Sequence, residues 1–416
     1  MQEMFSSSWS LKLNKDRLLF CFLVTCLLLT MFQSKRLYFT WGIPTSLLSV
    51  MTVISCICII SHYRKNYRYV STSEILFLCL VFLLYSYEFI NVGELSLLSL
   101  LFHINVAFIA AFLIMSKVEL KERILKLVIL STQIIVAISL FGWILYLLQF
   151  PLPHYFSQTD SFYSHEVYYL FLVNQTSDII SIPRFAGMFL EPGHLGTMCC
   201  FLLHIGGYKL SKIGNIVLLL GIIFSLSLAA YGLLFGGFCL HLLFTNKKGG
   251  LYICTFLLFV VGIWGISNNY NQGYNYLNQK IFLRLAFEDG EMAGSNRTTN
   301  FFELHFERYL KSSETLMGVG REAYDTKADT NIVNGCAGYK RFFYIRGWVG
   351  TLLLCSFLIT YILKYKSNYT FPFFIVFVVA NLIRDYPLKE FWFFLFILAI
   401  PVYGHENEAY NNMKNV

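Results

Sequence analysis

The sequence predicts an all-α polytopic membrane protein with about twelve transmembrane helices and a large periplasmic loop between helices 9 and 10. Hydrophobic residues make up 56% of the 416 positions and charged residues only 13%, about half the charged share of a soluble domain. Apolar runs recur along the chain, and Lys and Arg mostly punctuate them. The net charge of +8 is therefore a topology signal, and no nucleic-acid partner is expected.

A helix needs about 20 apolar residues to cross the hydrocarbon core of a bilayer. We predict twelve spans, at residues 17–33, 39–61, 74–91, 97–115, 124–148, 187–207, 213–229, 231–246, 250–267, 344–363, 370–385 and 391–404. The first span lacks a small-residue cleavage site after it, so we interpret it as a membrane helix rather than a signal peptide. The division of 213–246 is placed at Ala230-Tyr231-Gly232. One long helix there would invert the orientation of every later span.

The distribution of cations supports twelve spans with both termini in the cytoplasm. The outer loops 92–96 and 149–183 then contain no Lys or Arg, as the positive-inside rule requires. The inner loops carry Arg64, Lys65, Arg68, Lys117, Lys121, Arg123, Lys209, Lys212, Lys247, Lys248, Lys364 and Lys366. The exceptions to the rule are Lys35, Arg36, Arg384 and Lys389, which fall in outer loops.

Two outer segments, 149–186 and 268–343, are longer than an ordinary connection, and both belong to the single membrane domain 1–416. Both are rich in aromatic residues, which predicts packing, ligand stacking or an aromatic belt at the membrane interface.

The cysteines predict no cross-links and no metal site. Ten of the eleven fall in apolar runs, as small buried hydrophobic residues do. The outer segments contain no Asp-x-Asp sequence or other clear metal-ligand cluster. We therefore expect neither a metal nor another cofactor.

Residues 296–311, NRTTNFFELHFERYLK, predict an amphipathic helix in the second long segment. Arg297, His305 and Arg308 share one face, which Leu304 interrupts. The apolar residues are Phe302, Phe306, Tyr309 and Leu310. Such a helix is expected to lie at the membrane surface with its basic stripe toward a cavity. The alternative is a solvated basic face on a surface helix.

The same segment and the start of the next span hold an unusual number of cations for the outer side of a membrane. They are Lys280, Arg284, Arg297, Arg308, Lys311, Arg321, Lys327, Lys340, Arg341 and Arg346. A long loop can escape the positive-inside rule. The cluster nevertheless suits an anionic substrate, because arginine binds phosphate through a bidentate fork.

Polar residues also gather where the sixth span begins, in RFAGMFLEPGHLG at 184–196. If the helix starts near Pro192, its free amides face outward and attract anions. If it starts near Phe185, Pro192 kinks it and Glu191 lies several residues inside. An ionisable residue at this depth is a functional candidate, and the alternative is an Arg184–Glu191 pair that only locks the fold. The glycines are expected to allow close helix approach.

Three segments together resemble one family. Residues 184–193, RFAGMFLEPG, resemble the R-x-x-G-x-x-x-E-P motif of bacterial O-antigen polymerases. NRT at 296–298 with LMGVG at 316–320 resembles the periplasmic-loop segment of the same superfamily, and RGWVG at 346–350 resembles the G-x-x-G that opens its next membrane helix. The related O-antigen ligases carry a histidine about ten residues before that G-x-x-G. Residues 334–339 read NGCAGY, without a histidine, which favours a polymerase.

The resemblance implies a metal-independent glycosyltransferase at the periplasmic face of the bacterial inner membrane. Its substrates would be undecaprenyl-diphosphate-linked oligosaccharide repeat units, which it joins into O-antigen polysaccharide for lipopolysaccharide. A chain-length regulator and a flippase are candidate partners besides the lipid bilayer. The main alternatives are a ligase of the same superfamily and a flippase for the same lipid.

The chemistry of this reaction suggests roles for the candidate residues. A diphosphate leaving group needs positive charge where negative charge develops, and arginines supply it without a metal. We predict that Arg184 and Arg297 clamp the diphosphate, supported by Arg308, Arg341, Arg321 and His305. Glu191 and His305 are candidates for the base that takes the proton of the attacking sugar hydroxyl.

Overall fold

The computed structural model describes residues 15–32, 44–62, 71–92, 95–159, 164–176, 184–246, 248–275, 278, 287–288, 291–292, 300–329 and 338–414. Arg297 and the segment 334–337 lie outside these residues. The described helices of the first half are α1 (Lys15–Phe32), α2 (Thr45–His62), α3 (Thr72–Tyr87) with its π-helical end η2 (Glu88–Val92), α4 (Leu97–Met115), α5 (Val118–Leu147) and α6 (Pro192–Ile205). Those of the second half are α7 (Ile213–Ser225), α8 (Leu228–Thr245), α9 (Gly249–Asn269) with η3 (Tyr270–Gly273), α11 (Asn300–Leu310), η5 (Ser313–Thr315), α12 (Arg321–Asp329), α13 (Gly338–Lys364), α14 (Thr370–Ile383) and α15 (Glu390–Lys414).

The helices have the length and composition of a membrane protein. Six described helices are long and apolar enough to cross a bilayer, at 72–91, 97–115, 118–147, 228–245, 249–273 and 338–364. Five shorter apolar helices lie at 20–31, 46–60, 213–225, 370–383 and 390–404. The helical membrane character predicted from composition is confirmed, while the count of twelve spans stays a prediction.

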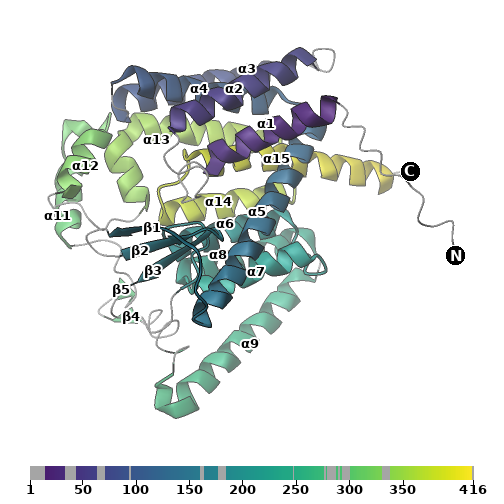
Figure 1. Ribbon diagram of the computed structural model, residues 1–416, viewed down its shortest axis with the longest axis vertical. Helices are drawn as coiled ribbons and strands as arrows, with labels where there is room; N and C mark the ends of the chain where they lie inside the picture. Colours follow the sequence, from purple (N-terminus) through teal and green to yellow (C-terminus); the bar gives the residue numbers. More distant parts are fainter. Residues whose placement is uncertain are drawn as a thin grey trace.

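The core is built around α15, the last apolar helix of the chain. Its residues from Trp392 to Ile400 are at most 1% exposed, because α1, α4, α5 and α14 pack around it. Figure 1 shows α1–α4 and α13 on one side of α15 and α5–α8 on the other, with α9 extending away from the bundle. The strands, α11 and α12 lie at one end of the bundle, and α1 begins near its other end.

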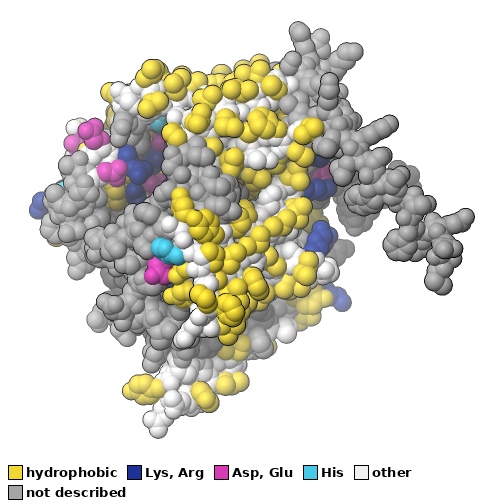
Figure 2. Space-filling view, viewed as in Figure 1, with side chains coloured by type: hydrophobic (Ala, Val, Ile, Leu, Met, Phe, Trp, Pro, Cys, Tyr) yellow, Lys and Arg dark blue, Asp and Glu magenta, His cyan; other side chains and the backbone are white. Residues whose placement is uncertain are grey.

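The charged side chains are also distributed unevenly between the middle of the bundle and its two ends. On the face drawn in Figure 2, hydrophobic side chains cover the middle, and the Lys and Arg side chains lie toward the two ends. Uncharged side chains over the middle and cations at the ends are what a bilayer requires of its lipid-facing surface.

The division of 213–246 into two helices is confirmed, but its predicted position was wrong. The chain turns at Leu226, which has a left-handed φ of 47°. Ser227 then caps α8 by accepting a hydrogen bond from the backbone N–H of Ala230. Ala230-Tyr231-Gly232 therefore lies within the first turns of α8, because a serine cap outweighs the single glycine as a start signal.

The first long segment contains a β-sheet that the all-α prediction missed. Strands β1 (His154–Thr159), β2 (Ser164–Tyr168) and β3 (Leu172–Thr176) form an antiparallel sheet in that order. Val167, Leu172 and Val173 are fully or almost fully buried, and the hydroxyl of Tyr168 donates to Glu166 at 2.6 Å. At least this part of the aromatic segment packs within the protein. Two further short strands, β4 (Phe287–Glu288) and β5 (Glu291–Met292), pair in the second segment.

Helix α11 confirms the amphipathic helix predicted in the second long segment. Phe302 is fully buried, and Phe306 and Tyr309 are less than 10% exposed, because all three pack on α13 around Tyr344. The hydroxyl of Tyr309 also donates to the carbonyl of Phe343 at 2.9 Å. Most of the apolar stripe is therefore buried within the protein, while Leu310 at its end remains 50% exposed.

Candidate functional site

Helix α6 begins at Pro192, which decides between the two predicted starting points. Glu191 is its N-cap residue, in an extended conformation with φ −121° and ψ 133°, and its side chain is 52% exposed. Pro192 is therefore the first helical residue and causes no kink. Glu191 lies at the mouth of the helix, where its carboxylate is accessible.

Arg184 supports the turn between α7 and α8. Its Nε donates to the carbonyl of Ser225 at 3.1 Å, and one terminal nitrogen donates to the carbonyl of Leu226 at 3.0 Å. Carbonyls at the end of a helix have no partner within the helix, so Arg184 satisfies two of the groups that the turn leaves open. This arrangement fixes Ser227 and the start of α8 beside α6.

Glu191 pairs with Arg384, which follows α14 directly. A terminal nitrogen of Arg384 lies 2.5 Å from Glu191 Oε2, and Nε2 of His194 lies 3.5 Å from the same oxygen. A methyl group on Gly193 would collide with the guanidinium of Arg384. Gly196 allows a similarly close approach, since its Cβ would lie 2.5 Å from that of Ala230. These two glycines have the packing role expected from the sequence.

Glu191 borders a charged pocket of about 350 Å³. Its lining consists of Glu191, His194, Arg321, Gly338, Arg341, Ile383, Arg384, Asp385, Tyr386 and Lys389. These residues come from the starts of α6, α12 and α13, from the end of α14 and from the loop between α14 and α15. Four cations face two carboxylates, which leaves a net charge of +2 with histidine neutral. The pocket therefore suits an anion.

A buried ion-pair network holds one wall of the charged pocket. Arg346 makes two hydrogen bonds to Glu88, at 2.6 and 3.0 Å, and both side chains are less than 10% exposed. Arg346 also lies 3.5 Å from Asp385, which Arg341 approaches at 3.8 Å. Paired charges of this kind fix α3, α13 and the 384–389 loop relative to one another, because separating them would leave a buried charge uncompensated.

Several donors at the pocket have capacity left for a ligand. Among the described residues that line the pocket, Nε of Arg341 and Nε of Arg384 are buried without a hydrogen-bond acceptor, although Arg341 Nε lies 3.8 Å from Asp385. Buried donors are normally paired, so the positive charge of these two guanidinium groups is only partly compensated by the protein. Arginine is suited to this role because its donors form a rigid fork.

Lys389 adds an ammonium group whose pKa depends on the burial and the charges around it in the pocket. The side chain is exposed on one side, yet its surroundings desolvate the ammonium and lower the pKa of Lys389. Asp385 and Glu390 oppose this shift in pKa, while Arg341 and Arg321 add to it. A bound anion would favour the protonated form.

An aromatic side chain orders this part of the pocket. The ring of Tyr386 meets that of His194 edge-on, with centroids 4.8 Å apart. Nζ of Lys389 lies 4.8 Å from the centroid of Tyr386, within the range of a cation–π contact. Tyr386 thereby holds a histidine and a lysine at neighbouring positions.

The two glycine-containing motifs, 316–320 and 346–350, cross each other beside the pocket. The backbone N–H groups of Val319 and Gly320 donate to the carbonyls of Tyr344 and Ile345, at 3.0 and 3.1 Å. Those carbonyls are free because α13 breaks at Gly347, which has φ 58°. A Cβ on Gly347 would collide with the backbone of Gly318. The crossing therefore requires glycine, and it places Arg321 in the pocket lining and Arg346 in the ion-pair network beside it.

The structure brings together some of the predicted site residues and separates others. Glu191, Arg321 and Arg341 line the charged pocket. Arg184 supports the turn behind it. His305 and Arg308 lie on α11 and are not part of the lining. Arg297 lies outside the described residues.

Seven lining residues were not predicted: His194, Gly338, Ile383, Arg384, Asp385, Tyr386 and Lys389. Arg384 and Lys389 had carried a usable signal, because both violate the positive-inside rule in a short loop. His194 lies in the motif at 184–196, three residues after Glu191, on the face that an N-cap carboxylate can reach. Asp385 and Tyr386 show no such signal.

Among the described residues, no group of three or more His, Cys, Asp or Glu side chains is arranged to hold a metal ion. The carboxylates of Glu191 and Asp385 face arginines instead. Comparison with known proteins finds no matching family model, no matching curated protein and no matching solved structure.

Proposed function

We propose that this protein polymerises lipid-diphosphate-linked oligosaccharides into O-antigen polysaccharide. The observation that carries the proposal is the charged pocket at the N-terminal end of α6, where four cations and the Glu191 carboxylate meet at one end of an apolar helical bundle. A membrane-embedded carrier with a diphosphate headgroup needs cations at that depth, and a sugar acceptor needs a base beside them. The resemblance of three segments to O-antigen polymerases supports the same conclusion.

The reaction is a glycosyl transfer in which no side chain of the protein acts as a nucleophile. A hydroxyl oxygen of the acceptor sugar bonds to the anomeric carbon of the donor glycan, and the bond from that carbon to the diphosphate breaks. The lipid diphosphate leaves with the electron pair, and its growing negative charge is stabilised by the cations. The hydroxyl proton passes to Glu191, the half-exposed carboxylate at the pocket edge.

The geometry revises the division of labour among the arginines. We assign diphosphate binding to Arg341, Arg384 and Lys389, because they line the pocket and two of them have buried donors without acceptors among the described residues. We assign Arg184 a positioning role, through the α7–α8 turn that it caps. His194 orients Glu191 and shares its ion pair with Arg384.

A flippase would need a cationic route from one side of the membrane to the other. Along α6, below the charged pocket, Cys199, Cys200, Phe201 and Leu202 are at most 1% exposed. These packed apolar side chains separate the pocket from the opposite end of the helix. The arrangement favours a reaction at one face over transport.

For the membrane arrangement we propose that the charged pocket faces the periplasm and that both termini are cytoplasmic, in the inner membrane of a bacterium. Two features support this orientation. The inner loops carry many of the lysines, and the two long segments fall on the outer side. The natural partners would be the carrier-linked repeat units, with a flippase supplying them and a chain-length regulator acting on the product.

Deletion of the gene followed by gel analysis of lipopolysaccharide tests the proposal. Loss of a polymerase leaves a single repeat unit on the lipid core, whereas loss of a flippase leaves none. A ligase deletion removes O-antigen from the core altogether and leaves polymer on the carrier. A mutant with a full ladder would rule out the proposed function.

A further inference from the structure

A second cavity, of about 870 Å³, lies at the opposite end of α6. It is bordered by α5, the α6–α7 loop, α8, α14 and α15. Helix α6 has 14 residues and is therefore about 21 Å long, so this cavity is separate from the charged pocket. We call it the lysine cavity, after Lys126, Lys209 and Lys212.

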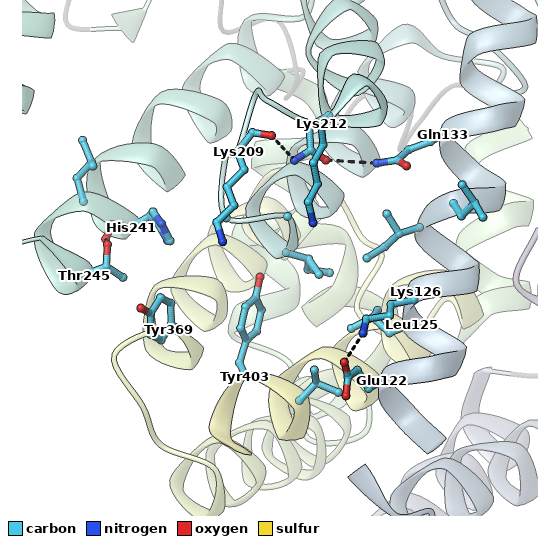
Figure 3. Close-up of a pocket in the computed structure, with 18 of the residues that line it drawn as sticks. Glu122, Leu125, Lys126, Gln133, Lys209, Lys212, His241, Thr245, Tyr369 and Tyr403 are labelled. Atoms are coloured by element: carbon cyan, nitrogen blue, oxygen red, sulfur yellow. Dashed lines mark hydrogen bonds and ion pairs between the residues drawn. The ribbon is translucent and has the colours of Figure 1, made fainter. Parts of the chain in front are cut away.

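The lysine cavity has an excess of positive charge at its polar side. Three lysines and one carboxylate, Glu122, line it, which gives a net charge of +2. Lys126 forms an ion pair with Glu122. Lys209 and Lys212 have no ion-pair partner among the residues that the structure describes. Figure 3 shows both side chains extending from the α6–α7 loop into the cavity, toward Tyr403.

The loop that carries these two lysines is held in place by buried amides. Asn215, which is 2% exposed, donates to the carbonyl of Lys209 at 2.9 Å. Gln133 on α5 donates to Asn215 at 3.3 Å. The loop backbone is therefore ordered before a ligand binds, and only the two exposed lysine side chains remain to be ordered.

The other side of the cavity is apolar and reaches the lipid-facing surface. Leu125 on α5 is 4% exposed, while Leu130, one and a half turns later, is 51% exposed. Leu242 and Val402 continue the apolar lining. A ligand that fills the whole cavity must therefore combine an anionic group with a hydrophobic part that leaves past Leu130.

We propose that the lysine cavity binds the phosphate headgroup of an anionic phospholipid from the bilayer leaflet at this end of the bundle, with its acyl chains leaving along α5 past Leu130. Lys209 and Lys212 contact the phosphate, and Tyr369 and Thr245 lie at the cavity wall that faces the rest of the headgroup. Basic pockets between membrane helices commonly select such lipids. The proposal does not depend on glycosyl transfer.

Native mass spectrometry of the full-length protein in detergent tests the inference. The probes are short-chain phosphatidylglycerol, phosphatidylcholine with the same chains, glycerol phosphate and inorganic phosphate. We expect phosphatidylglycerol to bind more tightly than the other three. The variant Lys209→Gln/Lys212→Gln should weaken that binding roughly 10- to 30-fold, since each lysine contributes to phosphate attraction.

The matched control is Lys364→Gln/Lys366→Gln, which removes the same charge near the cytoplasmic ends of α13 and α14 without touching the cavity lining. It should bind phosphatidylglycerol within about twofold of the unmodified protein, since neither lysine lines the cavity and salt screens exposed charges that do not contact the ligand. Leu130→Trp, which leaves the charge unchanged, should also weaken lipid binding by obstructing the exit.

Three outcomes would contradict the inference. Equal effects of the two double-lysine variants would mean that binding reflects general charge and not the cavity. Binding of inorganic phosphate or glycerol phosphate as tight as that of phosphatidylglycerol would mean that the ligand is a soluble anion. Retention of lipid affinity in Leu130→Trp would remove the proposed exit path.

Discussion

Glu191 and Arg384 are 193 positions apart in the sequence, and their contact brings the motif at 184–196 to the loop after α14. Composition and spacing can select Glu191, because a carboxylate at the mouth of an apolar helix is costly. They cannot select its partner among the many outer cations, because partner choice depends on how α6 and α14 pack. For this reason the sequence favoured Arg184, whose guanidinium faces the α7–α8 turn.

The first prediction separates the structural assignment from the sequence-based one. Arg384→Ala should lower the rate of chain growth roughly 100-fold, because it removes a donor to the leaving group and the ion-pair partner of Glu191. Arg308→Ala, on the exposed side of α11, should stay within about twofold of the unmodified rate. The measurement is the elongation rate with purified protein at matched expression and melting temperature.

The reverse result, a large loss in Arg308→Ala and none in Arg384→Ala, would return the diphosphate site to α11. Equal losses of elongation rate in both variants would show that the diphosphate site includes residues beyond the lining of the charged pocket.

The second prediction concerns pH. Because desolvation lowers the pKa of Lys389, its ammonium loses its proton below the pH at which an exposed lysine does, about 10.4. Attraction for the diphosphate is thus present below the lowered pKa and declines as pH rises through it. We expect kcat/KM to fall on the alkaline side, and Lys389→Arg to move that fall to higher pH. An identical alkaline limb in both proteins would exclude Lys389 from substrate binding.

At the scale of elements, the glycine motifs and the helix breaks decide how the site is assembled. The sequence identified LMGVG and RGWVG as separate features, and the structure joins them at the break of α13 at Gly347. Apolar periodicity cannot reveal such a break, because the flanking residues remain helical in pattern on both sides. It also cannot reveal the β1–β3 sheet, whose polar and aromatic strands lack clean alternation.

The third prediction is that Gly347→Ala destabilises the protein by about 1–3 kcal/mol or more. The change places a side chain at φ 58° and against the backbone of Gly318, so it adds strain to a steric clash. Thermal unfolding in detergent, followed by loss of helical circular dichroism, measures the effect.

Gly265→Ala in α9 is the matched control, because a Cβ there meets nothing within 4 Å. Its apparent Tm should be unchanged or slightly raised, since alanine favours helix more than glycine. If Gly347→Ala melted at the same temperature as this control, the crossing of the two motifs would not contribute to stability.

At the scale of the whole molecule, the bundle places a charged pocket and a lysine cavity at opposite ends of the same short helix, α6. The amphiphilic layout follows from composition, because a bilayer accepts only apolar side chains at its centre and lets cations collect at its edges. The helical, membrane-type character of the chain is therefore the part that sequence predicts best. Sequence predicts least well which residues line each site, because residues such as Asp385 and Tyr386 reach the pocket only through the packing of the helices.

The central claim is that the charged pocket catalyses transfer of a glycan from one lipid diphosphate to the next carrier-linked unit. The most direct measurement is a reaction of the purified protein with a defined undecaprenyl-diphosphate-linked repeat unit, analysed for chain length. The account predicts a ladder of products with the unmodified protein, and only the starting unit with Glu191→Gln or Arg384→Ala. Chain growth at the full rate in both variants, or no growth with the unmodified protein in an active membrane preparation, would contradict it.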